Sequence, residues 1–338
     1  MNVNPWYLQM ALSAKVHGGT TVPAMQPPMH IPDGFLSPTI ALIFWLLAAV
    51  VVAYALWRVN REFDERRVPL MGVLAAAIFA GQMLNFAVAG GTSGHLLGAA
   101  LATILLGPWA SIVVMTVVVG VQALLFQDGG LLVLGANIFN MAIVGSLVAY
   151  AVYHVIRRLL AGRSWALYVA SFAAAWLSIV IAALVAALQL ALSGTSPANL
   201  AVPAMGGIHM LIGIGEGLIT VGALSLLAAT RRDLVEQPAT AQSVQRGVVI
   251  IGLAIAILLA ILSPLASSYP DGLEWVAEQQ GFIERAQEPL YEIIPDYVMP
   301  GISNEALATI LAGIVGTVIV FGVAFLTGRI SRQRQEAK

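Results

Sequence analysis

The sequence predicts an all-α, polytopic membrane protein with about nine transmembrane helices. Apolar residues make up 59% of the chain and charged residues only 10%, whereas a soluble domain carries about 25% charge. Apolar runs of about 20 residues recur along the chain, and each is long enough to cross a hydrocarbon core of roughly 30 Å. Basic residues gather in a few clusters between these runs, as expected of membrane-flanking loops.

The nine expected spans follow one another with short connections. They are residues 37–57, 68–89, 95–106, 109–126, 132–156, 165–192, 207–229, 248–266 and 305–327. The third span is short, because a helix over 95–106 rises only about 18 Å. A single helix over 95–126 would instead be about 48 Å long, too long for one crossing. Gly107 and Pro108 supply the break, since proline disrupts helical hydrogen bonding.

The basic clusters fix the orientation. They follow spans one, five, seven and nine, and their members are Arg58, Arg61, Arg66 and Arg67; Arg157, Arg158 and Arg163; Arg231, Arg232 and Arg246; and Arg329, Arg332, Arg334 and Lys338. With nine spans all four clusters fall on one side, which the positive-inside rule makes cytoplasmic. The N-terminus is therefore predicted outside and the C-terminus inside.

Composition also divides the chain into parts. Residues 1–28 form an extension without a standard signal peptide, since a basic start is lacking. Residues 29–230 contain seven of the expected spans, and residues 248–338 contain the other two. A basic linker, 231–247, joins them, and an acidic, proline-containing loop over 267–304 faces outward.

Several classes of function are excluded or disfavoured. The net charge of −1 leaves no basic footprint for nucleic acid. The absence of cysteine excludes disulfides, thiolate metal sites and iron–sulfur clusters. Nothing in the sequence calls for an organic cofactor, and histidines number only five.

Polar side chains inside the spans crowd the outer half of the membrane. They form three pairs at helical spacing: Gln82 with Asn85, Asn137 with Asn140, and His209 with Glu216. Polar groups are costly in lipid, so these pairs are expected to face a shared cavity. The alternative for each amide pair is a purely structural hydrogen bond between helices.

Two histidines flank the outer ends of spans. His30 lies in the run MHIPDGF, residues 29–35, and His95 ends the glycine-rich run GGTSGH, residues 90–95. Two imidazoles beside membrane segments, with few other metal-binding side chains nearby, predict a transition-metal site at the outer mouth. His17, in a polar tail, and His154, beside a basic cluster, are interpreted as ordinary loop and interface residues.

At this point the motifs resemble a known family. The run at 29–35 is similar to the amino-terminal signature of the cobalt/nickel substrate-capture subunits (CbiM/NikM type) of energy-coupling-factor transporters. Further similar runs are GTSGHLLG at 91–98, LLGPW at 105–109, DGG at 128–130 and GANIFN at 135–140. The run PDGLE at 270–274 resembles the small companion subunit (CbiN/NikN type), so the chain looks like a fusion of both. On this resemblance we name residues 29–230 the capture body and residues 248–338 the companion module.

The resemblance implies a transporter subunit, not an enzyme, in a bacterial or archaeal cell (inner) membrane. Its substrate would be Ni²⁺ or Co²⁺, and its partners would be a transmembrane coupling subunit and cytoplasmic ATPase subunits that drive delivery. The implied ligands are the amine of Met29, the imidazole and backbone nitrogen of His30, and His95. Nitrogen ligands in a square plane suit Ni²⁺ or Cu²⁺. The residues expected to support or surround them are Asp33, Gln82, Asn85, Ser93, Asn137, Asn140, His209 and Glu216.

The chain departs from the family pattern at Met29, whose nitrogen is bonded to Pro28 and is not a free amine. Translation could begin at Met29, residues 1–28 could be removed, or another ligand could replace the amine, with His17 the one further imidazole in the extension. We favour a start at Met29.

Two other functions fit parts of the sequence. A rhomboid-like intramembrane serine protease would use Ser93 as nucleophile, His209 as base and Asn85 as oxyanion donor. The second alternative function is a stand-alone secondary metal transporter. Such proteins usually carry ionisable groups through the full membrane depth, whereas the inner half of the spans here is nearly all aliphatic.

Overall fold

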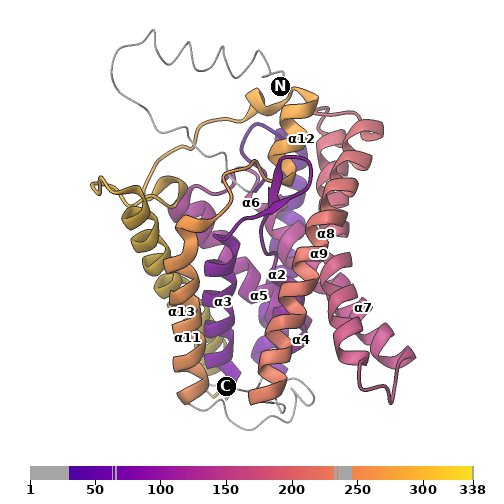
Figure 1. Cartoon of the computed structure of the whole chain (residues 1–338), viewed down its shortest axis with the longest axis vertical. Helices are drawn as coiled ribbons and strands as arrows, with labels where there is room; N and C mark the ends of the chain where they lie inside the picture. The colour runs from indigo at the N-terminus through magenta and orange to yellow at the C-terminus, as the bar shows by residue number, and fades with distance from the viewer. Residues whose placement is uncertain (1–29, 63, 65–66, 232–233, 235–245, 337–338) are drawn as a thin grey trace.

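The computed structural model describes residues 30–62, 64, 67–231, 234 and 246–336, and these form a bundle of helices (Figure 1). A two-stranded sheet is the sole β-structure among them. The elements, where η marks 3₁₀ or π segments, are α2 (Pro38–Glu62), α3 (Val68–Gln82), β1 (Phe86–Val88), β2 (Thr92–Gly94), α4 (Ala99–Leu106), α5 (Pro108–Val121), η2 (Gln122–Phe126), α6 (Leu134–Asn137), η3 (Ile138–Val144), α7 (Gly145–Leu159), α8 (Ala166–Leu192), α9 (Ala198–Thr230), α11 (Arg246–Leu262), η4 (Ser263–Leu265), α12 (Gly272–Gln280), η5 (Ile283–Arg285), η6 (Pro295–Tyr297) and α13 (Glu305–Glu336).

Within the described residues, seven helical stretches are long and apolar enough to cross a membrane. They are Pro38–Arg61, Pro108–Phe126, Leu134–Leu159, Ala166–Leu192, Ala198–Thr230, Arg246–Leu265 and Glu305–Ile330. The two shorter apolar helices are α3 and α4. The predicted all-α, polytopic membrane architecture is confirmed.

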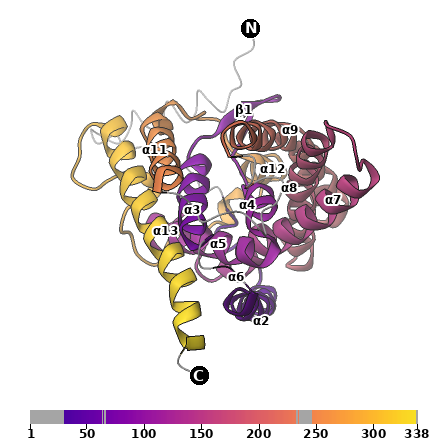
Figure 2. The same cartoon turned by 90° about the horizontal axis from the view of Figure 1, so that it is seen from below.

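The helices pack in two groups around α3, α4 and α5. Helices α7, α8 and α9 pack side by side on one flank, while α11 and α13 both pack against α3 on the other. Seen from below, α2 stands at the periphery of the bundle (Figure 2). The companion module is thus joined to the capture body mainly through α3.

The segment between α3 and α4 differs from its prediction. Residues 68–89 were expected to form one span, but α3 ends at Gln82, and residues 86–94 form the β1–β2 hairpin. Gly90 and Gly91, with φ of 86° and 78°, make its turn, a backbone conformation that other residues adopt only with strain. The pattern of apolar residues alone did not reveal this turn.

The third predicted span is also shorter than expected. Helix α4 begins at Ala99, not at His95, and its eight residues rise about 12 Å, so α4 lies inside the bundle without crossing it. Gly98 starts it with φ 81°, where a Cβ atom would lie 2.7 Å from the side chain of Ile78. Gly107 and Pro108 separate α4 from α5 as predicted.

The two ends of the bundle carry different residues. Arg157 and Arg158 lie in the last turn of α7, and the end of α13 lies at the same end of the bundle (Figure 1). The β1–β2 hairpin and α12 lie toward the opposite end (Figure 1). By the positive-inside rule, the hairpin and α12 belong to the outward side.

Candidate metal site

The two histidines singled out in the sequence lie side by side. The ring centroids of His30 and His95 are 5.6 Å apart, with their planes at 80°. The His30 side chain is buried, with 4% of its surface exposed, and His95 is half-buried. The segments that carry His30 and His95, which are distant in the sequence, therefore bring their imidazoles together at one place in the fold.

His30 is held in place through the residue that follows it. The Asn137 side-chain amide makes two hydrogen bonds with the backbone of Ile31. Its Oδ1 accepts from the Ile31 N–H at 3.1 Å, and its Nδ2 donates to the Ile31 carbonyl at 3.0 Å. The N–H of Gly130 donates to the same carbonyl at 2.9 Å. Asn137 thus positions the start of the described chain beside α6.

The imidazole of His30 is oriented by Asp128. Its Nδ1 lies 3.3 Å from the Asp128 carbonyl oxygen and 3.4 Å from the Asp128 Oδ1. Its Nε2 is buried and has no hydrogen-bond partner among the described residues. A proton on Nδ1 would leave the Nε2 lone pair for a metal ion, because neutral imidazole has one donor and one acceptor nitrogen. A Cβ atom at Gly129 would lie 2.8 Å from the Cβ of His30, so this approach requires glycine.

His95 is held by contacts to the residues just after it. The Gln82 Nε2 donates to the Leu97 carbonyl at 2.9 Å. The Glu216 carboxylate accepts from the N–H of Leu97 at 2.6 Å and from that of Gly98 at 2.9 Å. Glu216 therefore fixes the backbone that enters α4 (Ala99–Leu106) and places its carboxylate beside the N-terminus of this helix, where the helix dipole favours a negative charge.

His209 and Glu216 do not pair with each other. Glu216 binds backbone N–H groups, as described above, and the Nδ1 of His209 lies 2.8 Å from the Met205 carbonyl oxygen. His209 is close enough to His95 to interact with it electrostatically. It also lies against Gly272 of α12, where a Cβ atom would be 2.8 Å from the His209 ring. His209 thus flanks the two histidines on the side of the companion module.

Two of the remaining candidates serve structural contacts. Asn140 exchanges two hydrogen bonds of 2.8 Å with the Gln189 amide of α8, the interhelical alternative raised for this pair. Asp33 accepts from the N–H groups of Leu132 and Val133 at 2.9 and 3.2 Å. Burial raises the pKa of Asp33, and these backbone donors oppose that rise. Asn137, at the end of α6, and Asn140, in the π-helix η3, therefore bind different neighbours.

The glycine-rich run before His95 binds the PDGLE run of the companion module. The Ser93 N–H donates to the Pro270 carbonyl at 2.7 Å, and the Thr92 hydroxyl donates to the same oxygen at 3.0 Å. The Ser93 hydroxyl donates to the Tyr269 carbonyl at 2.7 Å. The glycine-rich run of the capture body and the PDGLE run of the companion module are therefore in direct contact.

The PDGLE run itself forms a capping box. The Asp271 side chain accepts from the Glu274 N–H at 2.8 Å, and the Glu274 carboxylate accepts from the Asp271 N–H at 3.3 Å. This Asp-x-x-Glu pattern is a recognised start signal for a helix, and sequence reasoning overlooked it. Burial raises the pKa of Asp271 well above 3.8 and that of Glu274 to about 7.

Replacing Ser93 with alanine is expected to leave metal capture nearly intact. The Ser93 hydroxyl is fully buried and donates to backbone carbonyls, so its loss removes about 1 kcal/mol of stability without touching either imidazole. Thermal unfolding and metal titration of the Ser93→Ala protein would measure both. Complete loss of an intrinsic peptidase activity in this variant would instead favour the protease alternative, for which the structure offers no hydrogen bond between Ser93 and His209 among the described residues.

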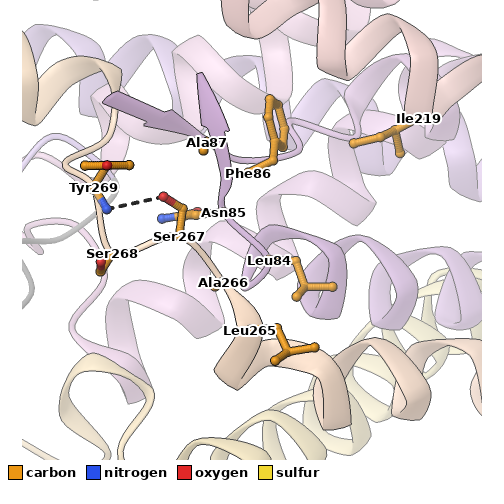
Figure 3. Close-up of a pocket in the computed structure, with 10 residues that line it drawn as sticks. All are labelled: Leu84, Asn85, Phe86, Ala87, Ile219, Leu265, Ala266, Ser267, Ser268 and Tyr269. Carbon is orange, nitrogen blue, oxygen red and sulfur yellow. Dashed lines mark hydrogen bonds between the residues drawn. The ribbon is translucent and has the colours of Figure 1, made fainter. Parts of the chain in front are cut away.

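A groove lies beside the site at the seam between the two parts of the chain. Its volume is about 700 Å³, and it is lined by residues 84–87, Ile219 and residues 265–269 (Figure 3). Within it the Tyr269 N–H donates to the Ser267 hydroxyl at 3.3 Å (Figure 3). Asn85 lines this groove, and its backbone carbonyl accepts from the Ser267 N–H at 2.8 Å. None of the lining residues is a histidine or a carboxylate, so the groove is separate from the imidazole pair.

The described side chains do not complete a metal coordination sphere. Met29 lies outside the described residues. Within the described ranges, no three His, Cys, Asp or Glu side chains gather closely enough to hold an ion.

The helical bundle and the paired imidazoles define the class: a multi-pass membrane transport protein for a transition metal. Residues 30–234 match the family described as the cobalt uptake substrate-specific transmembrane region (CbiM), and residues 246–333 match the PDGLE domain. The CbiM match covers more than half of the chain. The chain therefore belongs to the CbiM family and carries a CbiN-like PDGLE domain fused to it.

Similar proteins share this fused organisation. A protein of Archaeoglobus fulgidus provisionally named fused nickel transport protein NikMN is 42% identical over 90% of this chain and 99% of its own length. The fused nickel transport protein NikMN of Rhodobacter capsulatus is 29% identical over 89% of this chain and 97% of its own. A crystal structure of a truncated transition metal transporter is 36% identical, with a TM-score of 0.54 over 59% of this chain and 98% of that one.

Proposed function

We propose that this chain captures Ni²⁺ or Co²⁺ at the outer face of a bacterial or archaeal cell membrane and delivers it inward with partner subunits. The observation that carries the proposal is the convergence of His30 and His95, whose ring centroids lie 5.6 Å apart. The His30 ring is contacted at Nδ1 by Asp128, and its buried Nε2 has no hydrogen-bond partner among the described residues, so a single contact holds the ring and it can turn toward an ion.

The metal would be held by nitrogen atoms. The two imidazoles supply two ligands, and the backbone nitrogen of His30 and the amine of Met29 would supply two more. Four nitrogens in a square plane favour Ni²⁺ over the harder divalent ions. Chelation by the ring and the backbone nitrogen of the same residue requires Nδ1, so the His30 ring would exchange its contact with Asp128 for the ion during loading.

Residues 1–28 are proposed to be absent from the active protein, which would then begin with a free amine at Met29. Residues 29–230 would form the capture body and residues 248–338 the companion module. Amino-terminal sequencing of metal-loaded protein from the native membrane is expected to find Met29 first, and metal-loaded protein that begins at Met1 would contradict this.

Transport would require a transmembrane coupling subunit and cytoplasmic ATPase subunits. The polar candidates gather at one end of the bundle, around His30 and His95, which fits a subunit that binds the ion on one side and depends on others to move it. A secondary transporter would instead import metal without ATPases, so the two functions can be distinguished by whether uptake requires ATP hydrolysis.

The test measures uptake and binding together. Cells that express the chain with its coupling and ATPase subunits are expected to accumulate nickel or cobalt, and cells with ATPases inactivated in their nucleotide sites are expected not to. Metal analysis of the purified chain, after exposure to equal nickel and cobalt, is expected to find a single bound ion, with nickel in excess. A purified wild-type chain that binds neither metal would refute the proposal.

A further inference from the structure

A single short stretch of chain connects His95 with the opposite end of the bundle. Residues 95–98 lead from His95 into α4, which ends at Leu106. Four extended residues and the eight residues of α4 together reach at most about 25 Å, which is most of a hydrocarbon core of roughly 30 Å. A movement of α4 along the bundle would therefore move the His95 imidazole with it.

Helix α4 lies between two glycines that permit such a movement. Gly98 precedes it and Gly107 follows it, with φ of 81° and 84°, a region that glycine occupies without strain. A Cβ atom at Gly107 would meet no atom of the described residues within 4 Å, so the backbone there has open space. Hinges of moving segments are typically a few residues at the ends of elements that absorb changes in φ and ψ. Helix α4 is thus a short rigid element with a hinge at each end.

Charged side chains hold α4 at its two ends. At the outer end the Glu216 carboxylate accepts from the backbone N–H groups of Leu97 and Gly98. At the inner end the guanidinium of Arg67 donates to the Leu105 carbonyl in the last turn of α4. Carbonyls of a last helical turn lack partners within the helix, and the helix dipole favours a cation beside them. The acid and the base therefore hold opposite ends of the same helix.

Arg67 makes this contact from the cytoplasmic side of the protein. It lies in the short connection between α2 and α3, which follows the basic last turn of α2 and is cytoplasmic by the positive-inside rule. Only 8% of its surface is exposed, and burial of a charge is costly unless hydrogen bonds or an opposite charge offset it. The Leu105 carbonyl supplies the hydrogen bond, and Asp64 is close enough to supply the opposite charge. A cytoplasmic arginine is therefore directed into the bundle and onto α4.

We propose that Arg67 is a positioning residue for metal capture that latches the inner end of α4, and that release of this latch lets α4 and His95 withdraw from the ion. The inference rests on the proposed function, because it takes His95 to be a metal ligand. While Arg67 holds the Leu105 carbonyl, the segment from His95 to the end of α4 stays in the capture position. The latch lies at the cytoplasmic end, where the proposed ATPase subunits act, so it couples that end to the outer site.

The chain offers matched arginine variants. Arg67→Met removes the guanidinium and keeps a long apolar side chain in the buried position, and Arg67→Lys restores a charged donor. Arg61→Met removes an exposed arginine of the same cytoplasmic end, whose guanidinium lies 4.9 Å from the centroid of the Trp57 ring. A general effect of lost charge at this end would appear in both methionine variants, whereas loss of the latch affects only Arg67→Met.

The first experiment measures the dissociation of Ni²⁺ from the purified full-length proteins after mixing with excess chelator. Arg67→Met is expected to release Ni²⁺ about 10-fold faster than the wild type, the scale of one hydrogen bond to a charged group. Arg61→Met is expected to release it at the wild-type rate, and Arg67→Lys is expected to recover most of the difference. The absorption spectrum of the saturated site should be the same in all of them, because the ligands are unchanged.

The second experiment follows α4 itself and uses the absence of cysteine from the chain. Leu105→Cys places a thiol at a fully buried position of α4 and keeps the carbonyl that Arg67 binds, and Ile112→Cys places one at a fully buried position of α5. Addition of Arg67→Met is expected to speed the reaction of Leu105→Cys with a water-soluble maleimide, but not that of Ile112→Cys. Saturating Ni²⁺ is expected to slow the reaction of Leu105→Cys whether or not Arg67 is replaced, because the ion and the latch favour the same position of α4 and such coupling is reciprocal.

Wild-type release of Ni²⁺ from Arg67→Met, or equally fast release from Arg61→Met, would overturn the inference. So would a thiol in Leu105→Cys that reacts no faster when Arg67→Met is added, or one that Ni²⁺ does not protect. If the wild type binds Ni²⁺ and Arg67→Met behaves like it, only the latch fails. If the wild type binds no Ni²⁺, or if His95→Ala binds it as the wild type does, the proposed function fails and the latch fails with it.

Discussion

Replacing His30 with alanine is expected to abolish the capture of nickel or cobalt, and replacing His95 with alanine is expected to do the same. Each change removes one of the two imidazoles that meet at the site, and with it one of the four nitrogens proposed to hold the ion. The loss of affinity should exceed about 100-fold, since even groups that merely orient a ligand contribute 10–100-fold. Titration of the purified proteins with each metal measures this.

His154→Ala is the matched control for these variants. His154 lies on α7 near the basic end of the bundle, with its Nδ1 2.9 Å from the Tyr150 carbonyl oxygen. Its replacement removes an imidazole of the same kind but leaves the outer site unchanged, so metal binding should equal that of the wild type. Normal binding by His30→Ala, or an equal loss in His154→Ala, would show that the ion is held elsewhere.

Removal of the Glu216 carboxylate is expected to destabilise the protein and to weaken metal capture together. In Glu216→Ala, the N–H groups of Leu97 and Gly98 lose their acceptors inside a fully buried site. Unpaired buried donors of this kind cost about 3 kcal/mol in total. Residues 95–98 would then be free to shift, and His95 with them, so both the thermal unfolding temperature and the metal affinity should fall.

Glu305→Ala gives the comparison for this carboxylate. Glu305 is an exposed acid in the first turn of α13, where its loss should change stability by less than about 0.5 kcal/mol. The stability and metal affinity of Glu216→Gln should lie between those of Glu216→Ala and Glu305→Ala. The glutamine amide can accept a hydrogen bond from one of the two backbone N–H groups but presents its own N–H to the other. If Glu216→Ala unfolds and binds metal as Glu305→Ala does, the carboxylate does not hold the His95 segment.

Much of the site was accessible from residue types and spacing. His30 and His95 were selected because histidines are rare in the chain and these two flank apolar spans. The contact between them was expected and is observed. Asn137 and Gln82 were proposed as supports, and the structure shows them binding the backbone next to these histidines, not the rings.

Other parts of the site were missed for identifiable reasons. Asp128 was not predicted to contact a histidine, because nothing local indicates which distant side chain its carboxylate faces. The Tyr297 hydroxyl donates to the Asp128 Oδ2 at 2.6 Å, and Tyr297 was not singled out because the two residues lie 169 positions apart in the sequence. Glu216 was expected to pair with His209 because both lie on one helix face, but a carboxylate finds stronger partners at the start of α4 than in a neutral imidazole.

The sequence by itself determined the membrane class, the break at Gly107 and Pro108, and the two histidines, because hydrophobic length, proline and residue chemistry act locally. Only the tertiary structure decided that residues 86–106 form a hairpin and a short buried helix, and that the PDGLE run packs against the segment before His95. Those outcomes depend on which backbone groups, distant in the sequence, form hydrogen bonds with each other in the folded bundle. Burial of polar atoms enforces such pairing, but it leaves no periodic pattern in the chain.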